Sequence, residues 1–343
     1  MRSKLYSTPY HAIDISQCRF LVTGGAGFIG SNIVEYLLAF GAGQVRILDN
    51  LSNGYRENIE EFQAHPNFEF VEGDIRDLAT SQKAVEGMDF ISHQAALGSV
   101  PRSIQDPITS NAVNISGFLN MLVAAKESPS LKRMIYAASS STYGDSPELP
   151  KVEGREGKPL SPYAVTKAVN EYYADVFSQV YGFHTIGLRY FNVFGPRQNP
   201  NNPYAAVIPI FCKHFMDGST PTINGDGETS RDFTFVENAV QANIQSMLHG
   251  VGQTAEKGMT QHEVINVACG DQVTLNEMVE MLNDITGKGI TAQYGPERPG
   301  DVRHSRAQIS KAEQLFGYAP RFRFQEGLKI VYDWYCAQGE FPA

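Results

Sequence analysis

The fold is decided by the stretch Thr23-Gly24-Gly25-Ala26-Gly27-Phe28-Ile29-Gly30, which directly follows the short apolar run Phe20-Leu21-Val22. The residues after it, 31–38, have helical spacing. This arrangement of glycines lets a chain turn tightly from a strand into a helix and lets its backbone approach a pyrophosphate closely. The helix N-terminus then faces the phosphates, where its dipole and N–H groups stabilise negative charge. Taken alone, the glycines could also form an ordinary tight turn.

Short apolar, β-branched runs alternate with helical segments along the chain. Besides 20–22, such runs occur at 45–48, 68–71, 90–92, 134–136, 185–188 and 264–267. Alternating strands and helices are typical of an α/β fold, so we predict a Rossmann-type, doubly wound parallel sheet of about seven strands. We expect residues 18–190, with a return at about 237–271, to form the nucleotide-binding domain. We expect 191–236 and 272–340 to form a smaller α/β substrate-binding domain, with loops rich in Pro, Asn and Gly over the ligand.

Composition indicates a globular protein that works on small molecules. Of 343 residues, 42% are hydrophobic and 19% charged, and no continuous apolar run is long enough to span a bilayer. The first residues lack the apolar core of a secretory signal, so we expect a cytoplasmic protein without a membrane partner. A net charge of −9 argues against nucleic acid as a partner. The four scattered cysteines predict neither a disulfide framework nor a metal site, and Cys18 and Cys269 are predicted to lie in buried strands.

Carboxylates follow the second and third predicted strands. Asp49 ends the second run, about 20 residues after the last glycine, where it can accept hydrogen bonds from an adenosine ribose. A carboxylate there repels a 2′-phosphate, so the sequence favours NAD over NADP. Asp74 follows the third run and could contact adenine, or alternatively cap a helix. Gln94 and the small residues after it could let the cofactor approach the fourth strand.

Hydroxyl groups gather after the fifth run, in Ser139-Ser140-Ser141-Thr142-Tyr143-Gly144, at the strand end where ligands bind in parallel sheets. Tyr163 and Lys167 share one face of a predicted helix. A free phenol, with a pKa of roughly 10, is a poor base, and we expect the Lys167 ammonium to lower the pKa of Tyr163. Tyr163 could then take a proton from a substrate hydroxyl while the carbon gives hydride to NAD. Alone, the pair could be an exposed helix turn with a snorkelling lysine.

Together these motifs resemble the extended short-chain dehydrogenase/reductase family over nearly the whole chain. Within it, the sequence is most similar to nucleotide-sugar 4-epimerases, particularly bacterial UDP-N-acetylglucosamine 4-epimerases of surface-polysaccharide pathways. The closer resemblance is carried by His93-Gln94-Ala95-Ala96-Leu97-Gly98-Ser99-Val100-Pro101-Arg102-Ser103, Arg189-Tyr190-Phe191-Asn192-Val193-Phe194-Gly195 and Ile223-Asn224-Gly225-Asp226-Gly227-Glu228-Thr229-Ser230-Arg231-Asp232-Phe233. It implies an NAD-dependent enzyme that interconverts UDP-GlcNAc and UDP-GalNAc through a 4-keto intermediate, with UDP-Glc and UDP-Gal as a weaker pair.

The resemblance also implies roles for individual residues. The catalytic set is Ser139, Tyr163 and Lys167, where family members place the catalytic hydroxyl four residues before the Tyr143-Gly144 pair; from the residues alone, Ser140 and Ser141 stay open as that hydroxyl. The predicted cofactor-binding residues are Gly24, Gly27, Phe28, Ile29, Gly30, Asp49, Asn50, Ser52, Gly54, Asp74, Ile75, Gln94, Asn114, Tyr163 and Lys167. The predicted substrate-binding residues are Ser99, Ser140, Ser141, Asn192, Ala206, Val207, Asn224, Arg231, Arg298, Asp301 and Ser305.

Three of these positions bear on the reaction. Related sugar dehydratases carry an Asp-Glu pair after the catalytic hydroxyl, where this chain has serines, so we expect no dehydration. The family's two diphosphate-binding arginines fall on Arg231 and Arg298, whose planar forks suit phosphate; either alone could be a surface ion pair. Galactose-specific epimerases often have a tyrosine at the position of Ser305, so the small residue here should leave room for a 2-acetamido group.

Two other functions remain open from the sequence. A UDP-glucuronic acid 4-epimerase or decarboxylase would begin with the same oxidation. A non-catalytic NAD-binding protein could use the same fold, because fold does not fix function. The resemblance further implies a homodimer, formed through the helices predicted at 111–126 and 161–181.

Overall fold

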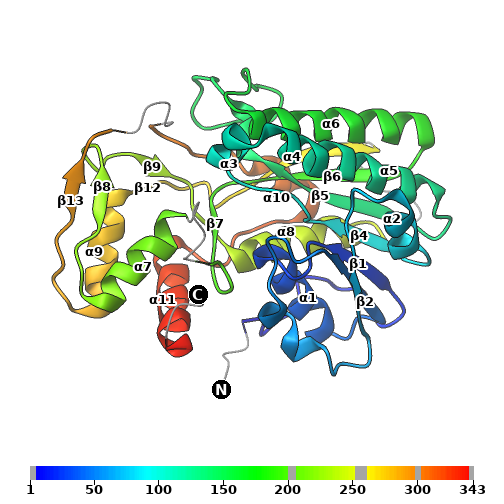
Figure 1. Ribbon diagram of the computed structural model, residues 1–343, viewed down its shortest axis with the longest axis horizontal. Helices are drawn as coiled ribbons and strands as arrows, with labels where there is room; N and C mark the ends of the chain where they lie inside the picture. Colours follow the sequence, from blue (N-terminus) through cyan, green and yellow to red (C-terminus); the bar gives the residue numbers. More distant parts are fainter. Residues whose placement is uncertain (1–4, 200–205, 252–260, 298–302, 340–343) are drawn as a thin grey trace.

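The computed structural model describes residues 5–199, 206–251, 261–297 and 303–339. Its centre is a seven-stranded, all-parallel sheet in the order β11-β6-β5-β4-β1-β2-β3 (Figure 1), as the sequence predicts. The strands are β1 (Arg19–Thr23), β2 (Gln44–Asp49), β3 (Phe68–Glu72), β4 (Phe90–His93), β5 (Arg133–Ser139), β6 (His184–Tyr190) and β11 (His262–Val267). Each predicted run lies within one strand. Inner strands such as β1, β4 and β5 are buried on both faces and therefore read as continuous apolar segments, whereas the edge strand β3 is only partly buried.

Helices cover both faces of the sheet (Figure 1). One layer contains α1 (Phe28–Ala39), α8 (Val236–Leu248) and α10 (Ser310–Phe316). The other contains α2 (Leu78–Val85), α3 (Val100–Gln105), α4 (Pro107–Asn111), α5 (Phe118–Glu127) and α6 (Pro162–Tyr181). Short 3-10 turns lie at Arg56–Asn58, Glu60–Phe62 and Ser140–Tyr143.

A smaller lobe lies beside the sheet, on the left of Figure 1. Its helices are α7 (Val207–Asp217), α9 (Leu275–Thr286) and α11 (Phe324–Gln338). Its two-residue and three-residue strands pair as β7 (Val193–Phe194) with β10 (Thr234–Phe235), β9 (Ser230–Arg231) with β12 (Val273–Thr274), and β8 (Thr222–Asn224) with β13 (Gln293–Gly295). They enclose a separate apolar core that includes Phe194, Phe215, Met278 and Tyr335.

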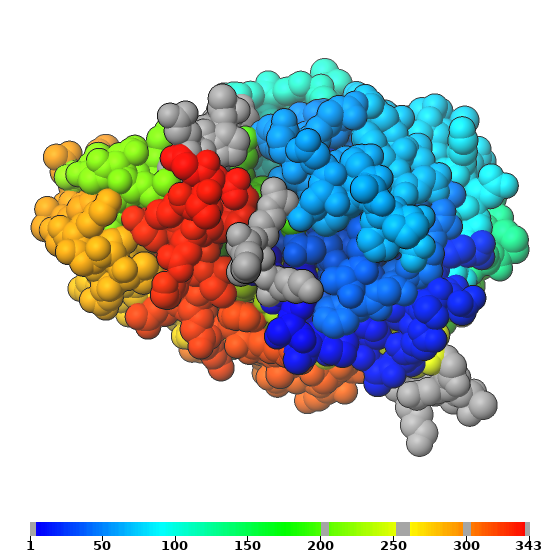
Figure 2. Space-filling model, turned by 90° about the horizontal axis from the view of Figure 1, so that it is seen from below, coloured from blue at the N-terminus to red at the C-terminus, as the bar shows by residue number. Residues whose placement is uncertain are grey.

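The packing differs from the predicted domain ranges at two places. Helix α10 falls within the range 272–340, yet it contacts β11 and α8, and Ala312 belongs to the core of the sheet. Residues before 18 also join that core: Tyr10 stacks on Tyr36 with ring centroids 5.2 Å apart, and its hydroxyl donates to Glu237 of α8. The blue N-terminal arm in Figure 2 lies beside α11. These contacts join segments far apart in sequence, which local patterns do not reveal.

Helices α4 and α5 are joined by a π-helical segment, Ala112–Gly117, so that Pro107–Glu127 runs as one helix. By length and composition it could span a bilayer, with a mean hydropathy of 1.2 and 44% of that window buried. This criterion is also met by core helices of globular proteins, and Phe118 and Met121 are fully buried against the sheet. Cys18 and Cys269 are buried as predicted, but they lie just outside β1 and β11 rather than within strands.

Helix α6 is attached to the sheet by a buried group of charges. Arg189 of β6 forms a two-pronged ion pair with Glu171 of α6, with N–O distances of 2.9 and 2.6 Å, and a second ion pair with Glu156. The Arg189 side chain is only 4% exposed. Losing one partner of such a pair is costly because it leaves a buried charge uncompensated. The group therefore fixes the helix that carries Tyr163 and Lys167.

Candidate active site

The glycine-rich turn between β1 and α1 is built on close backbone approach. A Cβ on Gly30 would lie 2.1 Å from the carbonyl oxygen of Gly24, and Gly24 itself has φ +66°. The Gly27 N–H donates to the Gly24 carbonyl over 3.0 Å, and Gly27 caps α1 without a side-chain hydrogen bond. The first turn of α1 thus presents backbone N–H groups suited to an anion.

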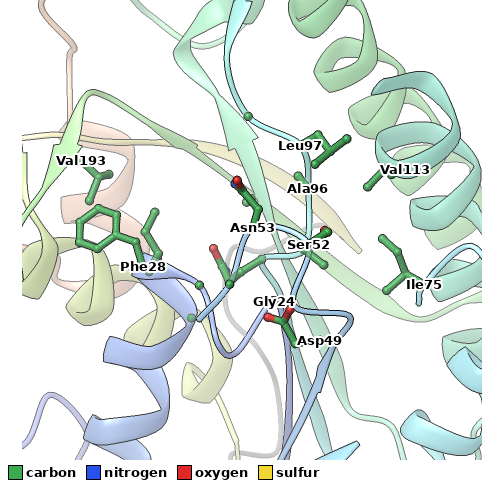
Figure 3. A pocket seen from close by; sticks show the side chains of 18 of the residues that line it. Gly24, Phe28, Asp49, Ser52, Asn53, Ile75, Ala96, Leu97, Val113 and Val193 are labelled. Carbon is green, nitrogen blue, oxygen red and sulfur yellow. The ribbon is translucent and has the colours of Figure 1, made fainter. Parts of the chain in front are cut away.

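A cavity of about 440 Å³ runs along the carboxyl edge of the sheet, from β2 and β3 to β6. Figure 3 shows Gly24, Asp49, Ser52 and Ile75 around one part of it and Phe28 and Val193 around another. Its lining includes the predicted residues Gly24, Gly27, Phe28, Ile29, Gly30, Asp49, Asn50, Ser52, Gly54, Asp74, Ile75, Gln94, Ser139, Tyr163, Lys167, Asn192 and Ala206. One continuous cavity therefore joins the glycine turn, both carboxylates and the proposed catalytic set.

The β2–β3 end of the cavity is acidic. Asp49 is buried, which raises its carboxyl pKa, and it accepts hydrogen bonds from the backbone N–H groups of Ala26 (2.9 Å) and Leu51 (2.8 Å). Asp74 accepts from Arg76 and Asn50 at 2.6 and 2.7 Å. The hydrogen bond from Arg76 lowers the pKa of Asp74 to about 2. The alternative that Asp74 caps a helix is wrong, because Asp77 caps α2.

The catalytic candidates meet near the end of β5. Ser139 adjoins the Tyr163 phenol and opposes the rise in its pKa; Ser139 Oγ accepts from Ser141 Oγ over 2.9 Å. Lys167 is buried with its Nζ 2.8 Å from the carbonyl oxygen of Ala137 and 5.9 Å from the Tyr163 ring centroid. Ser139 lines the cavity, whereas Ser140 and Ser141 are not part of its lining. This geometry favours Ser139 among the three serines.

The protonation of this set differs from the prediction. Burial raises the pKa of Tyr163, and only the Ser139 hydrogen bond opposes that shift; the predicted lowering by Lys167 is not found among these protein groups. Burial lowers the pKa of Lys167 to about 8, with the Glu171 charge opposing the shift. A dry site thus disfavours both charged forms. A phenolate would therefore need additional positive charge next to it.

Two predicted residues have structural contacts instead of facing the cavity. Asn114, predicted to bind the cofactor, is buried, and its amide exchanges hydrogen bonds with the backbone of Leu97 at 2.8 and 3.0 Å. Ser99, predicted to bind substrate, has φ +92° and accepts from the Arg102 N–H as the cap of α3. Neither residue lines the cavity. Both shape the loop after β4: Ser99 caps the helix that follows it, and Asn114, in the middle of the π-helical segment, binds its backbone at Leu97.

The sequence missed a polar network behind the cavity. Asn243 of α8 donates to the Tyr190 hydroxyl over 2.7 Å, and that hydroxyl donates to Gln94 Oε1 over 3.1 Å. Gln94 Nε2 in turn donates to Asn243 Oδ1 over 3.1 Å. Tyr190 and Gln94 line the cavity, so α8 fixes two wall residues. The polar character of α8 at buried positions was the available signal.

The remaining substrate candidates lie in the smaller lobe. Arg231 donates to the carbonyls of Ser230 (2.9 Å) and Arg303 (3.2 Å), and the Ser305 N–H donates to the Ser230 carbonyl over 3.1 Å. These hydrogen bonds hold the segments that carry Arg231 and Ser305 next to each other. Arg231 and Ser305, together with Val207 and Asn224, are not part of the cavity lining among the described residues. Arg298 and Asp301 lie outside the described residues.

Asp232, next to Arg231, organises these pieces. Its buried carboxyl accepts from the backbone N–H groups of Cys269 (2.9 Å), Gly270 (3.1 Å) and Ala307 (3.1 Å). Its own carbonyl accepts from Asn192 Nδ2 over 3.1 Å. The residue therefore connects the cavity wall at Asn192 with the segment that carries Ser305. The sequence placed Asp232 within a motif of the resemblance but assigned it no role.

Among the described lining residues of the cavity, no carboxylate lies at the Tyr163 end. Among the described residues of the cavity lining, the only carboxylates are Asp49 and Asp74, both at the β2–β3 end. In the described parts of the chain there is also no group of three or more His, Cys, Asp or Glu side chains that could hold a metal ion. At the Tyr163 end, the described lining residues offer the hydroxyl of Ser139, the phenol of Tyr163 and the ammonium of Lys167.

Comparison with known proteins agrees with this geometry. The sequence profile of the GDP-mannose 4,6 dehydratase family matches residues 21–331. The chain belongs to this family. The family is one of the extended short-chain dehydrogenases/reductases, and its relatives here are nucleotide-sugar 4-epimerases and dehydratases. The chain is therefore an enzyme of the nucleotide-sugar 4-epimerase and dehydratase type.

Three family members illustrate its range. A UDP-N-acetylglucosamine 4-epimerase from Methanobrevibacter ruminantium M1, in complex with UDP-N-acetylmuramic acid, is 40% identical with a TM-score of 0.86, covering 94% of this chain and 99% of that one. A UDP-glucose 4-epimerase from Mycolicibacterium smegmatis is 35% identical over 90% of this chain and 96% of its own. A UDP-glucuronic acid 4-epimerase from Bacillus cereus, in complex with UDP-glucuronic acid and NAD, is 30% identical with a TM-score of 0.83. The match covers 93% of this chain and 99% of that one.

We predict that Gly30→Ala weakens dinucleotide binding at least about tenfold, since a Cβ there overlaps the Gly24 carbonyl oxygen and must displace the turn that faces the phosphates. Isothermal titration of the protein with NAD measures this. Gly295→Ala is the control, because its Cβ would make only ordinary contacts at 3.6 Å or more. Equal affinity for the Gly30 variant and the unaltered protein would show that the turn does not bind the dinucleotide.

Proposed function

We propose that this protein is an NAD-dependent 4-epimerase that interconverts UDP-GlcNAc and UDP-GalNAc, with UDP-Glc and UDP-Gal as a weaker pair. The observation that carries the proposal is the single cavity that links the glycine turn with Ser139, Tyr163 and Lys167 and has no carboxylate beside Tyr163 among its described lining residues. The non-catalytic alternative leaves the buried Ser139–Tyr163–Lys167 set without a purpose.

The cavity fits NAD along its whole length. The N-terminus of α1 and the glycine turn suit the pyrophosphate, Asp49 suits the ribose of the adenosine half, and Asp74 with Ile75 would border the adenine. Asp49 disfavours a 2′-phosphate because its buried carboxylate would face a second negative charge. When bound at the Tyr163 end, the nicotinamide ring would accept hydride from C4 of the sugar and return it.

Tyr163 is the proposed proton acceptor and donor at the sugar O4. Ser139, which adjoins the phenol, would bind the same sugar oxygen and hold it for proton transfer. Lys167, buried one helical turn later, supplies positive charge in a low-dielectric setting where such charge acts strongly. The positively charged oxidised ring would add the further charge that a phenolate needs here.

The described lining residues at the Tyr163 end include no carboxylic acid, which favours epimerisation over dehydration. Elimination of water from the 4-keto sugar needs a proton acceptor and a donor beside the ring. Ser140 and Ser141 occupy the positions where related dehydratases carry Asp and Glu, and the Ser141 hydroxyl donates to Ser139. The 4-keto sugar, anchored by its UDP through Arg231 and Arg298, would turn over and take hydride back on its other face.

The direct test is to incubate the purified protein with UDP-GlcNAc or UDP-Glc without added cofactor and to follow the C4 configuration by proton NMR. Rapid UDP-GalNAc formation is the expected result.

We further predict that Tyr163→Phe lowers turnover at least about 100-fold, because the proton acceptor is lost, while bound NAD and thermal stability stay unchanged. Undiminished turnover by this variant would exclude Tyr163 as the base; turnover of UDP-glucuronic acid alone would establish the glucuronate alternative.

The pH profile tests the role of Lys167. Its pKa of about 8 predicts that kcat/KM falls as pH rises through about 8, because the ammonium that favours the phenolate is lost. Unfolding would not explain this loss: a lysine pKa lower in the folded than in the unfolded state makes folding more favourable as pH rises between the two values. Lys167→Met should lower kcat and abolish this limb, and an unchanged alkaline limb in that variant would assign it to another group.

Ser305 is the proposed determinant of the acetamido preference. Because a tyrosine side chain would fill the space beside the sugar, Ser305→Tyr should lower kcat/KM for UDP-GlcNAc relative to UDP-Glc at least about tenfold. Ser305→Ala, which stays small, should keep the preference of the unaltered enzyme. Paired kinetic assays on both substrates measure the ratio, and an unaltered ratio in the tyrosine variant would remove Ser305 from the sugar site.

We also propose a homodimer formed through α5 and α6. Helix α6 exposes an apolar stripe whose members are spaced along one helix face: Val165, Tyr172, Val176 and Val180, exposed by 46 to 73%. Ile108 of the neighbouring α4 is 82% exposed. Replacing both Tyr172 and Val176 by Glu should give a monomer by light scattering after gel filtration. Tyr294→Glu, at an exposed tyrosine of the smaller lobe, is the control, and a dimer that survives the double change would place the interface elsewhere.

A further inference from the structure

A short segment after β7, residues 196–199, crosses from the smaller lobe to the sheet and lines the cavity with Arg197, Gln198 and Asn199. We call this segment the clasp. Arg197 has φ +71°, a left-handed conformation that a residue with a side chain rarely adopts without anchors elsewhere. Contacts of its side chain must therefore hold Arg197 in this conformation.

The Arg197 side chain is anchored on the nucleotide-binding half of the molecule. Its guanidinium lies 2.6 Å from Glu35 of α1 and 2.9 Å from Glu61, donates to Asn32 Oδ1 over 3.3 Å, and lies over the Phe62 ring. The side chain is only 10% exposed. Two carboxylates on a nearly buried guanidinium form a strong, directional anchor.

The other clasp residues are tied to both sides of the cavity. Asn32 Nδ2 donates to the Pro196 carbonyl over 3.2 Å, and Asn199 Nδ2 donates to the Tyr55 hydroxyl over 2.6 Å. Tyr55 in turn donates its N–H to the carbonyl of Ala26 in the glycine turn. On the smaller lobe, the Tyr335 hydroxyl of α11 donates to the Gln198 carbonyl over 2.7 Å. The clasp thus bridges the two lobes beside the glycine turn.

We propose that the clasp retains the dinucleotide in its cavity during turnover and that Arg197 is its positioning residue. This inference rests on the proposed function, because an epimerase must return hydride to the same sugar from the same bound cofactor, and loss of the reduced dinucleotide would strand the keto sugar. Arg197 acts through position: with its charge matched by Glu35 and Glu61, it keeps residues 196–199 against the cavity instead of supplying free charge to the phosphates.

Retention is measured by the rate at which bound NAD leaves the protein. Purified enzyme loaded with radiolabelled NAD is diluted into excess unlabelled NAD, and the label that stays with the protein is followed by rapid filtration. Arg197→Met should release label about tenfold faster or more, equivalent to about 1.4 kcal/mol. Arg197→Lys, which keeps one ion pair, should fall between. Asn199→Ala should also release label faster, through loss of the bond to Tyr55.

Arg46→Met is the matched control. Arg46 is similarly enclosed, with its side chain 14% exposed and an ion pair to Glu69, but it contacts the backbone of 84–86 away from the cavity. The rate of NAD release from the Arg46→Met variant should match that of the unaltered enzyme. This holds even if the melting temperature of the Arg46→Met variant falls as far as that of Arg197→Met. Equal release rates for Arg197→Met, Asn199→Ala and the unaltered protein would overturn the clasp. The measurement needs no turnover, so absence of epimerase activity would overturn the proposed function while leaving this result readable.

Discussion

The site depends on the close approach of Gly30 to the Gly24 carbonyl. Because there is no side chain at either position, α1 begins immediately after β1 and its first turn faces the cavity at the carboxyl edge of the sheet. The parallel register of β1, β2 and β4 then brings Asp49 and the loop after His93 to the same edge. One steric constraint of the backbone thus sets where a dinucleotide can lie, and every other group of the site is placed with respect to it.

Around that constraint, the proposed catalytic groups lie in a dry setting. The ion pairs of Arg189 hold α6 on the sheet, and the helix buries Lys167 close to its Tyr163 neighbour. Burial raises the pKa of Tyr163 and lowers that of Lys167. In the protein alone, burial therefore disfavours the charged form of each group. We infer that the positive nicotinamide ring completes the electrostatics, which would make the base competent only when the oxidised cofactor is in place.

Local patterns of the sequence predicted the sheet well. The inner strands, such as β1, β4 and β5, are recognised because they are buried on both faces. The edge strand β3 is only partly buried and is recognised by its bulky apolar residues, and the Asp49 and Tyr163/Lys167 placements follow from strand ends and helix spacing. The sequence could not predict which partners polar side chains meet across the fold. Asn114 was expected to bind the cofactor, but it hydrogen-bonds Leu97. Tyr10 near the N-terminus bonds Glu237, which is distant in sequence. Arg197 and Asn243 act through contacts that only the folded chain creates. The acidic partners of Arg197, for example, lie on α1 and near Phe62, far from it in sequence.

The central claim is that hydride leaves and returns to C4 within one enzyme-bound complex. The most direct measurement uses UDP-GlcNAc carrying deuterium at C4, incubated with the enzyme and excess unlabelled NADH, with the product examined by mass spectrometry and NMR. If the same bound cofactor returns the hydride, the UDP-GalNAc formed retains its deuterium at C4 in full. Loss of deuterium to solvent or to the added nicotinamide pool would contradict it.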